Sequence, residues 1–283
     1  MSVTLLTEVD SQLDFNLTLE SFEKPHLLGV RTFVDWTLSS SRQPALFYVS
    51  SASSLGAWSQ YHPNDPIPEE LPLDSGWKYA LAMGYAESKH VSERLLQLAA
   101  AAGAKVNILR SGQIAGPTPS SKGVWTPSEW FPTLVRSSKA LKKFPRDIGG
   151  QTEIDWIPCD VLAQVIVEIA SSRVGAQGGN LRIYNLVNPR HTKLRLLLDT
   201  IAETCGGEVV AYDEWLKALQ SLDPNDAKNL QTVPALKLMD FFRGLGQSRE
   251  SFMRTENGER DSTTMAGLQS LEKDVVRSWM KHW

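Results

Sequence analysis

The clearest hydrophobic pattern along the chain is a β-α-β unit between residues 45 and 110. Residues 45–50 (ALFYVS) are a short apolar run rich in β-formers, which is typical of a strand buried on both faces. Residues 84–102 carry apolar positions at helical spacing and stop before Gly103. Residues 105–110 (KVNILR) predict the next strand. A strand, a helical crossover and a second strand indicate a parallel sheet.

The pattern beyond this unit predicts one long excursion and then further strands and helices. Residues 111–152 are rich in Gly, Pro, Ser and Trp and show little periodicity, as expected of a segment that builds a substrate pocket. We expect strands at 153–157 and 181–187, and helices at 161–170 (capped by Asp160), 193–205, 233–245 and 268–283. Residues 246–264 are polar and are expected to be loose.

Composition narrows the class of protein without naming a function. Of the 283 residues 42% are hydrophobic and 22% charged, which is ordinary for a globular protein. The net charge of -3 and the lack of like-charge blocks give no reason to expect a nucleic-acid or membrane partner. The longest apolar stretch, 161–170, is too short and too polar to span a bilayer.

The cysteines and the N-terminus predict a cytoplasmic protein. Cys159 and Cys205 do not make a disulfide framework, and neither has metal-ligand spacing. The first residues, MSVTLLTEVD, lack a basic region and a cleavage signature, so we expect no secretory signal. The reducing interior of a cell is therefore the expected location, and no metal site is predicted.

A Tyr-x-x-x-Lys pair, Tyr85 and Lys89, lies on the predicted helix at 84–102. Four residues make about one turn, so the two side chains share a face, roughly 6 Å apart at Cβ. A nearby ammonium lowers the pKa of a phenol from about 10 and lets it exchange a proton with a carbonyl oxygen near neutral pH. Taken alone the motif is weak, because both residue types are common on helix surfaces.

Several serines follow the first predicted strand, and they strengthen the case that Tyr85 and Lys89 are catalytic. A hydroxyl at the carboxyl end of a parallel strand lies where such sheets bind ligands. We therefore predict that Ser51 hydrogen-bonds the same oxygen that Tyr85 protonates, and we choose it over Ser50, Ser53 and Ser54. The structural alternative for each serine is a polar turn.

Other candidate residues are weaker. The five histidines are scattered without ligand spacing, and no Gly-x-Ser-x-Gly is present, which argues against an α/β-hydrolase. Cys159 lies at a helix N-terminus, where a thiol can be activated, but we expect a buried apolar role. Trp125, Trp130 and Phe131 either line an acyl pocket or pack the second lobe, and the sequence does not separate these roles.

Ser51, Tyr85 and Lys89, in this order and spacing, resemble the extended short-chain dehydrogenases. More closely, the chain resembles the terminal thioester-reductase domains of fungal enzymes that are similar to nonribosomal peptide synthetases. The matching stretches are LDFNLTLESFEKPHLLGVRTFVDW (13–36), FYVSSASSLGAW (47–58), MGYAESKHVSERLL (83–96), ILRSGQIAGP (108–117) and EIDWIPCDVLAQVIVEIA (153–170).

The resemblance implies roles for particular residues. Tyr85 is the proton donor, Lys89 lowers its pKa and holds the nicotinamide ribose, and Ser51 polarises the substrate carbonyl. The nicotinamide neighbours implied by the same resemblance are Gly112, Gln113 and Ile114. The family uses NADP(H) to reduce a carrier-bound acyl thioester to an aldehyde or alcohol. The implied substrate is therefore a small molecule or an acyl group on a carrier protein.

One part of the family pattern is missing, namely the glycine-rich turn that cradles pyrophosphate. The match begins near residue 9, and the first glycine is Gly29. The later glycine pairs follow no predicted strand and open no helix; they are 149–150, 178–179, 206–207 and 244 with 246. About three β-α units of about 30 residues each are therefore absent from the pattern. We expect weak cofactor binding, and a second copy or a partner chain over the exposed sheet edge beside residues 45–50.

Together these observations predict an α/β fold with an incomplete Rossmann-like parallel sheet and a smaller, mostly helical substrate lobe. We assign residues 1–110 and 153–190 to the truncated Rossmann-like core, and 111–152 and 191–283 to the substrate lobe. The favoured function is a thioester-reductase-like oxidoreductase of specialised metabolism, with its cofactor half supplied by another chain or by an unorthodox N-terminus. Two alternatives stay open: a redox-free acid/base catalyst (a cyclase, aldolase or isomerase) using the same three residues, and an inactive remnant that docks a carrier protein.

Overall fold

The computed structural model describes residues 17–73, 76–173, 179–246 and 251–283. They divide into two compact units. Unit 1 comprises Met1–Gln113, Leu162–Pro189 and Ser251–Leu268, and unit 2 comprises Ile114–Val161, Arg190–Glu250 and Gln269–Trp283. These boundaries differ from the sequence-based ones in four places: 111–113 and 251–268 fall in unit 1, and 153–161 and Arg190 fall in unit 2.

Unit 1 contains the parallel sheet. Its strands are β1 (Ala45–Ser51), β2 (Lys105–Ser111) and β7 (Leu181–Leu186). Its helices are α1 (Leu19–Phe22), α2 (Leu28–Ser39), α3 (Trp58–Tyr61), α4 (Gly84–Ala101), α11 (Glu256–Asp261) and α12 (Thr263–Ala266), with α6 (Cys159–Arg173) from Leu162 onward. Single turns occur at η1 (Glu23–Leu27, π-helical), η2 (Ala52–Leu55) and η3 (Trp77–Tyr79).

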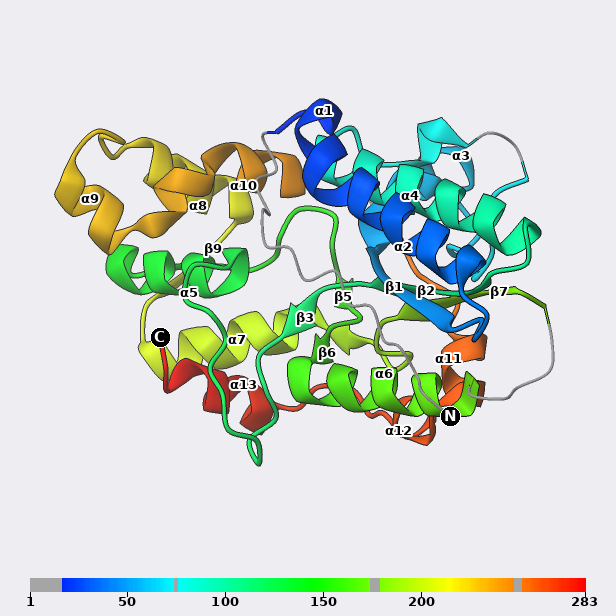
Figure 1. The fold of residues 1–283 in the computed structure, drawn as a ribbon. Helices are drawn as coiled ribbons and strands as arrows, with labels where there is room; N and C mark the ends of the chain where they lie inside the picture. The colour runs from blue at the N-terminus through cyan, green and yellow to red at the C-terminus, as the bar shows by residue number, and fades with distance from the viewer. Residues whose placement is uncertain (1–16, 74–75, 174–178, 247–250) are drawn as a thin grey trace. The chain divides into compact units, whose positions relative to one another are not determined.

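The three strands run parallel in the order β1-β2-β7, which confirms the predicted α/β class. Leu46, Phe47 and Tyr48 of β1 are all buried, so the strand carries apolar side chains on both faces, as its sequence indicates. Helices α2 and α4 lie side by side and both contact β1 (Figure 1). In the register, Ser51 pairs with Ser111, which in turn pairs with Leu186. The carboxyl ends of all three strands therefore form one edge.

Helix α4 is held at both ends by glycine. At its start, a Cβ on Gly84 would collide with the backbone of Leu17 and Thr18, so only glycine permits this close approach. After its end, Gly103 has a φ of 104°, a backbone conformation that side chains with a Cβ rarely adopt. The helix thus begins one residue before Tyr85 and returns the chain to β2, as the pattern predicts.

Unit 2 is mostly helical, with three short strand pairs. Its helices are α5 (Trp130–Leu141), α7 (Leu194–Cys205), α8 (Tyr212–Gln220), α9 (Ala227–Thr232), α10 (Met239–Leu245) and α13 (Lys273–Met280), with a 3-10 turn η4 (Pro234–Leu238). The pairs are β3 (Ile114–Ala115) with β6 (Ile157–Pro158), β4 (Lys143–Pro145) with β9 (Glu208–Val210), and β5 (Glu153–Ile154) with β8 (Thr192–Lys193).

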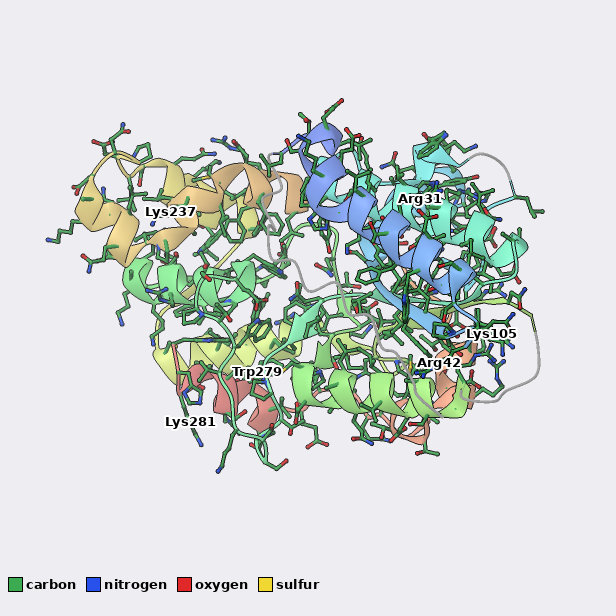
Figure 2. The ribbon with its side chains drawn as sticks, in the orientation of Figure 1. Arg31, Arg42, Lys105, Lys237, Trp279 and Lys281 are labelled. Atoms are coloured by element: carbon green, nitrogen blue, oxygen red, sulfur yellow. The ribbon has the colours of Figure 1, made fainter. Side chains whose placement is uncertain are left out.

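An aromatic cluster fills the core of unit 2. The Trp125 and Trp279 ring centroids are 5.0 Å apart, and those of Phe131 and Trp156 are 4.7 Å apart. The indole N–H of Trp279, labelled in Figure 2, donates to the carbonyl of Pro117 at 2.8 Å. Trp125 and Phe131 are buried in this cluster, which favours the packing role over the acyl-pocket alternative for both.

The excursion at 111–152 contains a helix that its weak periodicity does not reveal, and the prediction that 246–264 is loose is wrong. The excursion at 111–152 contains α5, which buries Phe131, Leu134 and Val135 along one face, a helical spacing that the surrounding Pro and Gly obscure. The segment at 246–264 contains α11 and α12, apart from residues 247–250, which lie outside the described ranges. Polar residues form helices here because Glu168 holds the start of α12, accepting the Thr264 N–H at 3.0 Å and the Ser262 hydroxyl at 2.7 Å.

Glu69 ties three parts of unit 1 together. Its carboxylate accepts the backbone N–H of Asn185 at 3.0 Å and that of Asn257 at 2.5 Å, which joins β7 to the start of α11. The side chain is buried, and this burial raises the pKa of Glu69 from 4.5 to about 7. A raised pKa means that ionising this carboxyl group costs more free energy in the folded protein than in the unfolded chain. Ionisation of Glu69 therefore lowers the stability of the fold.

We therefore expect the free energy of unfolding to fall as pH rises from 4.5 to about 7, the window between the ordinary and the folded pKa of Glu69. The loss should be about 3 kcal/mol. Glu69→Gln removes the titrating group, so its urea unfolding curves should show a correspondingly smaller loss between these pH values. The control is Glu70→Gln, an exposed neighbour, which should follow the wild type. Equal pH dependence in wild type and Glu69→Gln would contradict this account.

No helix in the described ranges is both long enough and apolar enough to cross a bilayer.

Candidate active site

The structure brings together the three residues that the sequence predicts to be catalytic. Ser51 is the last residue of β1, and Tyr85 and Lys89 occupy the first and second turns of α4. The side chains of Ser51 and Tyr85 share a hydrogen bond. The Lys89 Nζ lies 5.7 Å from the centroid of the Tyr85 ring. All three belong to unit 1, at the carboxyl edge of its sheet.

Ser51 is held by the turn that follows β1. Its Oγ accepts the backbone N–H of Ser53 at 3.2 Å and lies 2.9 Å from the Ser53 hydroxyl, which also donates to it. Ser51 is thereby the N-cap of η2. With its oxygen accepting from Ser53, the Ser51 hydroxyl can donate its own proton toward Tyr85 or a ligand oxygen.

Lys89 is a buried cation, with only 5% of its surface exposed. Its Nζ donates to the carbonyl of Val49 at 3.1 Å and lies 4.9 Å from the centroid of the Tyr48 ring. A carbonyl oxygen and two aromatic faces compensate in part for the lost hydration of the ammonium group. Helix α4 and strand β1 thus supply its surroundings together.

The pKa of Tyr85 moves in the direction opposite to the sequence-based prediction. Burial raises the pKa of this phenol above its ordinary value of 10, and the hydrogen bond with Ser51 offsets only part of that rise. The prediction that Lys89 lowers this pKa is therefore wrong as a statement of the net direction. Because the raised pKa keeps the phenol protonated at neutral pH, Tyr85 is set to give a proton rather than to take one.

The predicted cofactor neighbours follow β2 at the same edge. Gly112 donates its N–H to the carbonyl of Leu186 at 3.3 Å, and Gln113 is half-buried. Both lie in unit 1, directly after the strand that pairs with β1. Ile114 begins unit 2 as the first residue of β3, where it is 38% exposed.

Sequence reasoning missed three residues near this edge. Ser111 is buried, and its Oγ has no hydrogen-bond partner among the described residues. It lies in register with Ser51, so a ligand bound at this edge could take its hydrogen bond. Glu93 and Arg110 form a buried ion pair. The sequence offers a signal for each of these two charged residues. Glu93 follows Lys89 by four positions on the same helix face, and Arg110 lies at the end of an otherwise apolar strand.

The other candidates do not join this site. His90 is buried on α4 with Nδ1 2.9 Å from the Ser54 carbonyl, a packing role. Both cysteines are free; Cys159 is exposed, contrary to the expected burial, and partial desolvation raises the pKa of its thiol. Within the described ranges, no three His, Cys, Asp or Glu side chains gather as a metal site requires.

The glycine pairs lie at turns other than strand-to-helix turns. Gly149 and Gly150 lie in the tight turn between bridged residues Ile148 and Gln151, and Gly206–Gly207 connects α7 to β9. Gly244 and Gly246 lie at the end of α10, and Gly178 is outside the described ranges. In the described residues, none of these pairs both follows a strand and opens a helix.

A parallel sheet with helical crossovers and a Ser-Tyr-Lys set at its carboxyl edge defines a Rossmann-like α/β protein. The family described as "Male sterility protein", whose model is named for NAD binding, matches residues 2–166 of the 283. The chain belongs to this family, which confirms the resemblance drawn from its sequence.

A carboxylic acid reductase of Neurospora crassa is 30% identical over 99% of this chain, and the chain spans 27% of the length of that protein. The terminal R domain of the myxalamid PKS-NRPS pathway has the same fold, with a TM-score of 0.74 and 22% identity over 96% of this chain and 66% of that one. A thiolation-reductase di-domain of an archaeal nonribosomal peptide synthetase gives a TM-score of 0.70 and 16% identity over 98% of this chain and 56% of that one. RMD from Pseudomonas aeruginosa, solved with NADPH, gives a TM-score of 0.58 and 16% identity over 99% of this chain and 81% of that one.

Proposed function

We propose that this chain is a thioester-reductase-like short-chain dehydrogenase of specialised metabolism that reduces a carrier-bound acyl thioester or a related carbonyl with NADPH. The observation that carries the proposal is the Ser51–Tyr85 hydrogen bond, with Lys89 one turn further along α4, at the carboxyl edge of a parallel sheet. The family and the reductase names of its relatives support this activity over the redox-free alternative.

In this proposal the carbonyl oxygen of the substrate accepts hydrogen bonds from Ser51 and Tyr85. When bound, NADPH would supply a hydride, which is one proton with two electrons, to the carbonyl carbon. Tyr85 gives its proton to the oxygen, consistent with a pKa that keeps it protonated. The carbon–sulfur bond of the resulting hemithioacetal then breaks, and the hydroxyl proton passes to the departing sulfur, so that the carrier leaves as a thiol and the carbonyl group of the aldehyde forms.

The residues at the sheet edge fit the nicotinamide end of the cofactor. Lys89 presents a buried ammonium beside Tyr85, and we propose that it holds the nicotinamide ribose. Ser111 adds a buried hydroxyl without a partner in the described residues, immediately before the proposed nicotinamide neighbours. Those neighbours are Gly112, Gln113 and Ile114. The described residues offer no comparable cradle for pyrophosphate, so the NADPH site is proposed to be incomplete.

The test is thioester-dependent NADPH oxidation by the whole chain, with cofactor in the millimolar range and the aldehyde product measured in parallel. The proposal predicts cofactor oxidation and aldehyde formation in equal amounts. A parallel reaction without cofactor separates the alternative: conversion of the carbonyl substrate there would show a redox-free acid/base catalyst and would contradict the reductase proposal.

We also propose that a second copy or a partner chain covers the free side of β1. Within the described ranges β1 pairs with β2 alone, although its Leu46, Phe47 and Tyr48 are buried as in an internal strand. We expect light scattering to give a mass near twice the 31.4 kDa of the chain. A monomer at high concentration would contradict this expectation.

A further inference from the structure

The site rests on a buried ion pair that takes no part in the proposed proton transfer. Arg110 Nη2 lies 2.7 Å from Glu93 Oε2, and neither side chain is exposed to solvent. Arg110 also donates to the carbonyls of Pro68 at 2.9 Å and Glu70 at 3.2 Å. Buried ion pairs are poor sources of stability, because desolvation of the charges offsets their attraction. A buried ion pair with this many hydrogen bonds is better explained by the positions in which it holds the neighbouring segments.

Glu93 fixes the turn that presents Ser51. Its Oε1 accepts the Ser50 hydroxyl at 2.6 Å and the Ser54 hydroxyl at 2.8 Å. These two serines lie on either side of Ser51 in the chain, and Ser54 belongs to η2, which Ser51 caps. One carboxylate oxygen therefore fastens both sides of the turn.

Glu93 also belongs to the helix that carries the proton donor. It follows Tyr85 by eight residues and Lys89 by four, so the three side chains lie on one face of α4. The carboxylate stays ionised, because the Arg110 guanidinium and the serine hydroxyls hold the pKa of Glu93 below its usual range despite burial. As a charged acceptor it binds both hydroxyls more strongly than a neutral group would.

We infer that Glu93 is a positioning residue, whose carboxylate holds the Ser51 turn against α4 so that the hydroxyls of Ser51 and Tyr85 stay within hydrogen-bonding distance. The inference deepens the proposed function and rests on it for the reaction that this geometry serves. It assigns Ser50 and Ser54 to the same role, because both of their hydroxyls donate to the Glu93 carboxylate.

Removing Glu93 itself is a poor test, because it leaves the buried Arg110 unpaired and the protein can fail to fold. The double variant Ser50→Ala/Ser54→Ala removes the two hydrogen bonds from the turn to Glu93 and keeps the Glu93–Arg110 ion pair. Ser92→Ala is the matched control: Ser92 is equally buried on α4, and its hydroxyl donates to the carbonyl of Ser88 at 2.9 Å, away from the Ser51 turn. Thermal unfolding of each variant establishes that it is folded.

The measurement is the ¹³Cζ resonance of Tyr85 near neutral pH, in protein whose six tyrosines are labelled at that carbon and with Tyr85→Phe used for assignment. Ser51→Ala defines the shift produced by losing the Ser51 hydrogen bond. We expect Ser50→Ala/Ser54→Ala to move the resonance in the same direction and Ser92→Ala to leave it in place. A double variant with the wild-type resonance would overturn the inference, as would a Ser92→Ala shift of equal size.

This readout needs no turnover, so it stands or falls separately from the proposed function. If the chain reduces a thioester, the double variant should also lose about 10–100-fold in kcat with KM changed less than about threefold, because misplaced groups act mainly on the chemical step. An unchanged kcat together with a shifted resonance would also overturn the positioning role. Wild-type protein without reductase activity but with the predicted shifts would refute the proposed function alone.

Discussion

Replacing Tyr85 with phenylalanine is expected to lower carbonyl turnover by about 10²–10⁴-fold, the usual contribution of a general acid. The substitution removes the proton that the raised pKa keeps on the phenol at neutral pH. It keeps the ring and its edge-on contact with Phe22, whose ring centroid lies 6.3 Å away. The fold should therefore survive, and steady-state kinetics on one carbonyl substrate would give the loss directly.

The control for this variant is Tyr61→Phe. Tyr61 is 49% exposed at the end of α3, and its hydroxyl belongs to no part of the proposed site. It should turn over substrate at the wild-type rate. A loss of less than about tenfold in Tyr85→Phe would show that Tyr85 is not the acid.

The affinity of the chain for NADPH is expected to be low. In a Rossmann site the pyrophosphate binds backbone N–H groups at a helix N-terminus, and the 2′-phosphate meets a basic residue after the second strand. The described residues offer only the nicotinamide end: Lys89, Tyr85 and the segment 112–114. Losing several charge-assisted hydrogen bonds of about 1.5–3 kcal/mol each turns a micromolar site into a millimolar or weaker one.

We therefore expect no saturable NADPH binding to the 283-residue chain at submillimolar cofactor. Titration calorimetry, or quenching of the nine tryptophans, would measure it. NADP⁺ and free nicotinamide mononucleotide should bind with similar weak affinity, because both would use the same nicotinamide contacts. Micromolar binding that depends on the adenosine phosphate would contradict this expectation and would reveal a phosphate site of another kind.

The sequence predicts those parts of the molecule that depend on local pattern. The apolar run of β1 and the spacing along α4 place Ser51 and Tyr85 at one edge, because a parallel strand and its crossover helix leave little freedom at that point. The hydrogen bond between them requires only that the turn after β1 face the start of α4.

What the sequence could not predict depends on contacts between distant residues. The net pKa direction of Tyr85 follows from burial, which no spacing along a helix reveals. Glu69 and Asn257 are 188 residues apart in the chain, and their hydrogen bond helps to hold 251–268 in unit 1. The pairing of Glu93 with Arg110 likewise joins a helix to a strand, and only the fold shows that both charges are buried.

The most direct test of the central claim, a carbonyl reductase site at Ser51, Tyr85 and Lys89, follows a labelled hydrogen. The whole chain is given an acyl thioester and millimolar NADPH deuterated at the transferable position, and the released aldehyde is analysed by mass spectrometry. The account predicts one deuterium in the aldehyde from wild-type protein and a loss of labelled product of about 10²–10⁴-fold in Tyr85→Phe. Product that carries no deuterium, or an equal yield of labelled product from Tyr85→Phe, would contradict it.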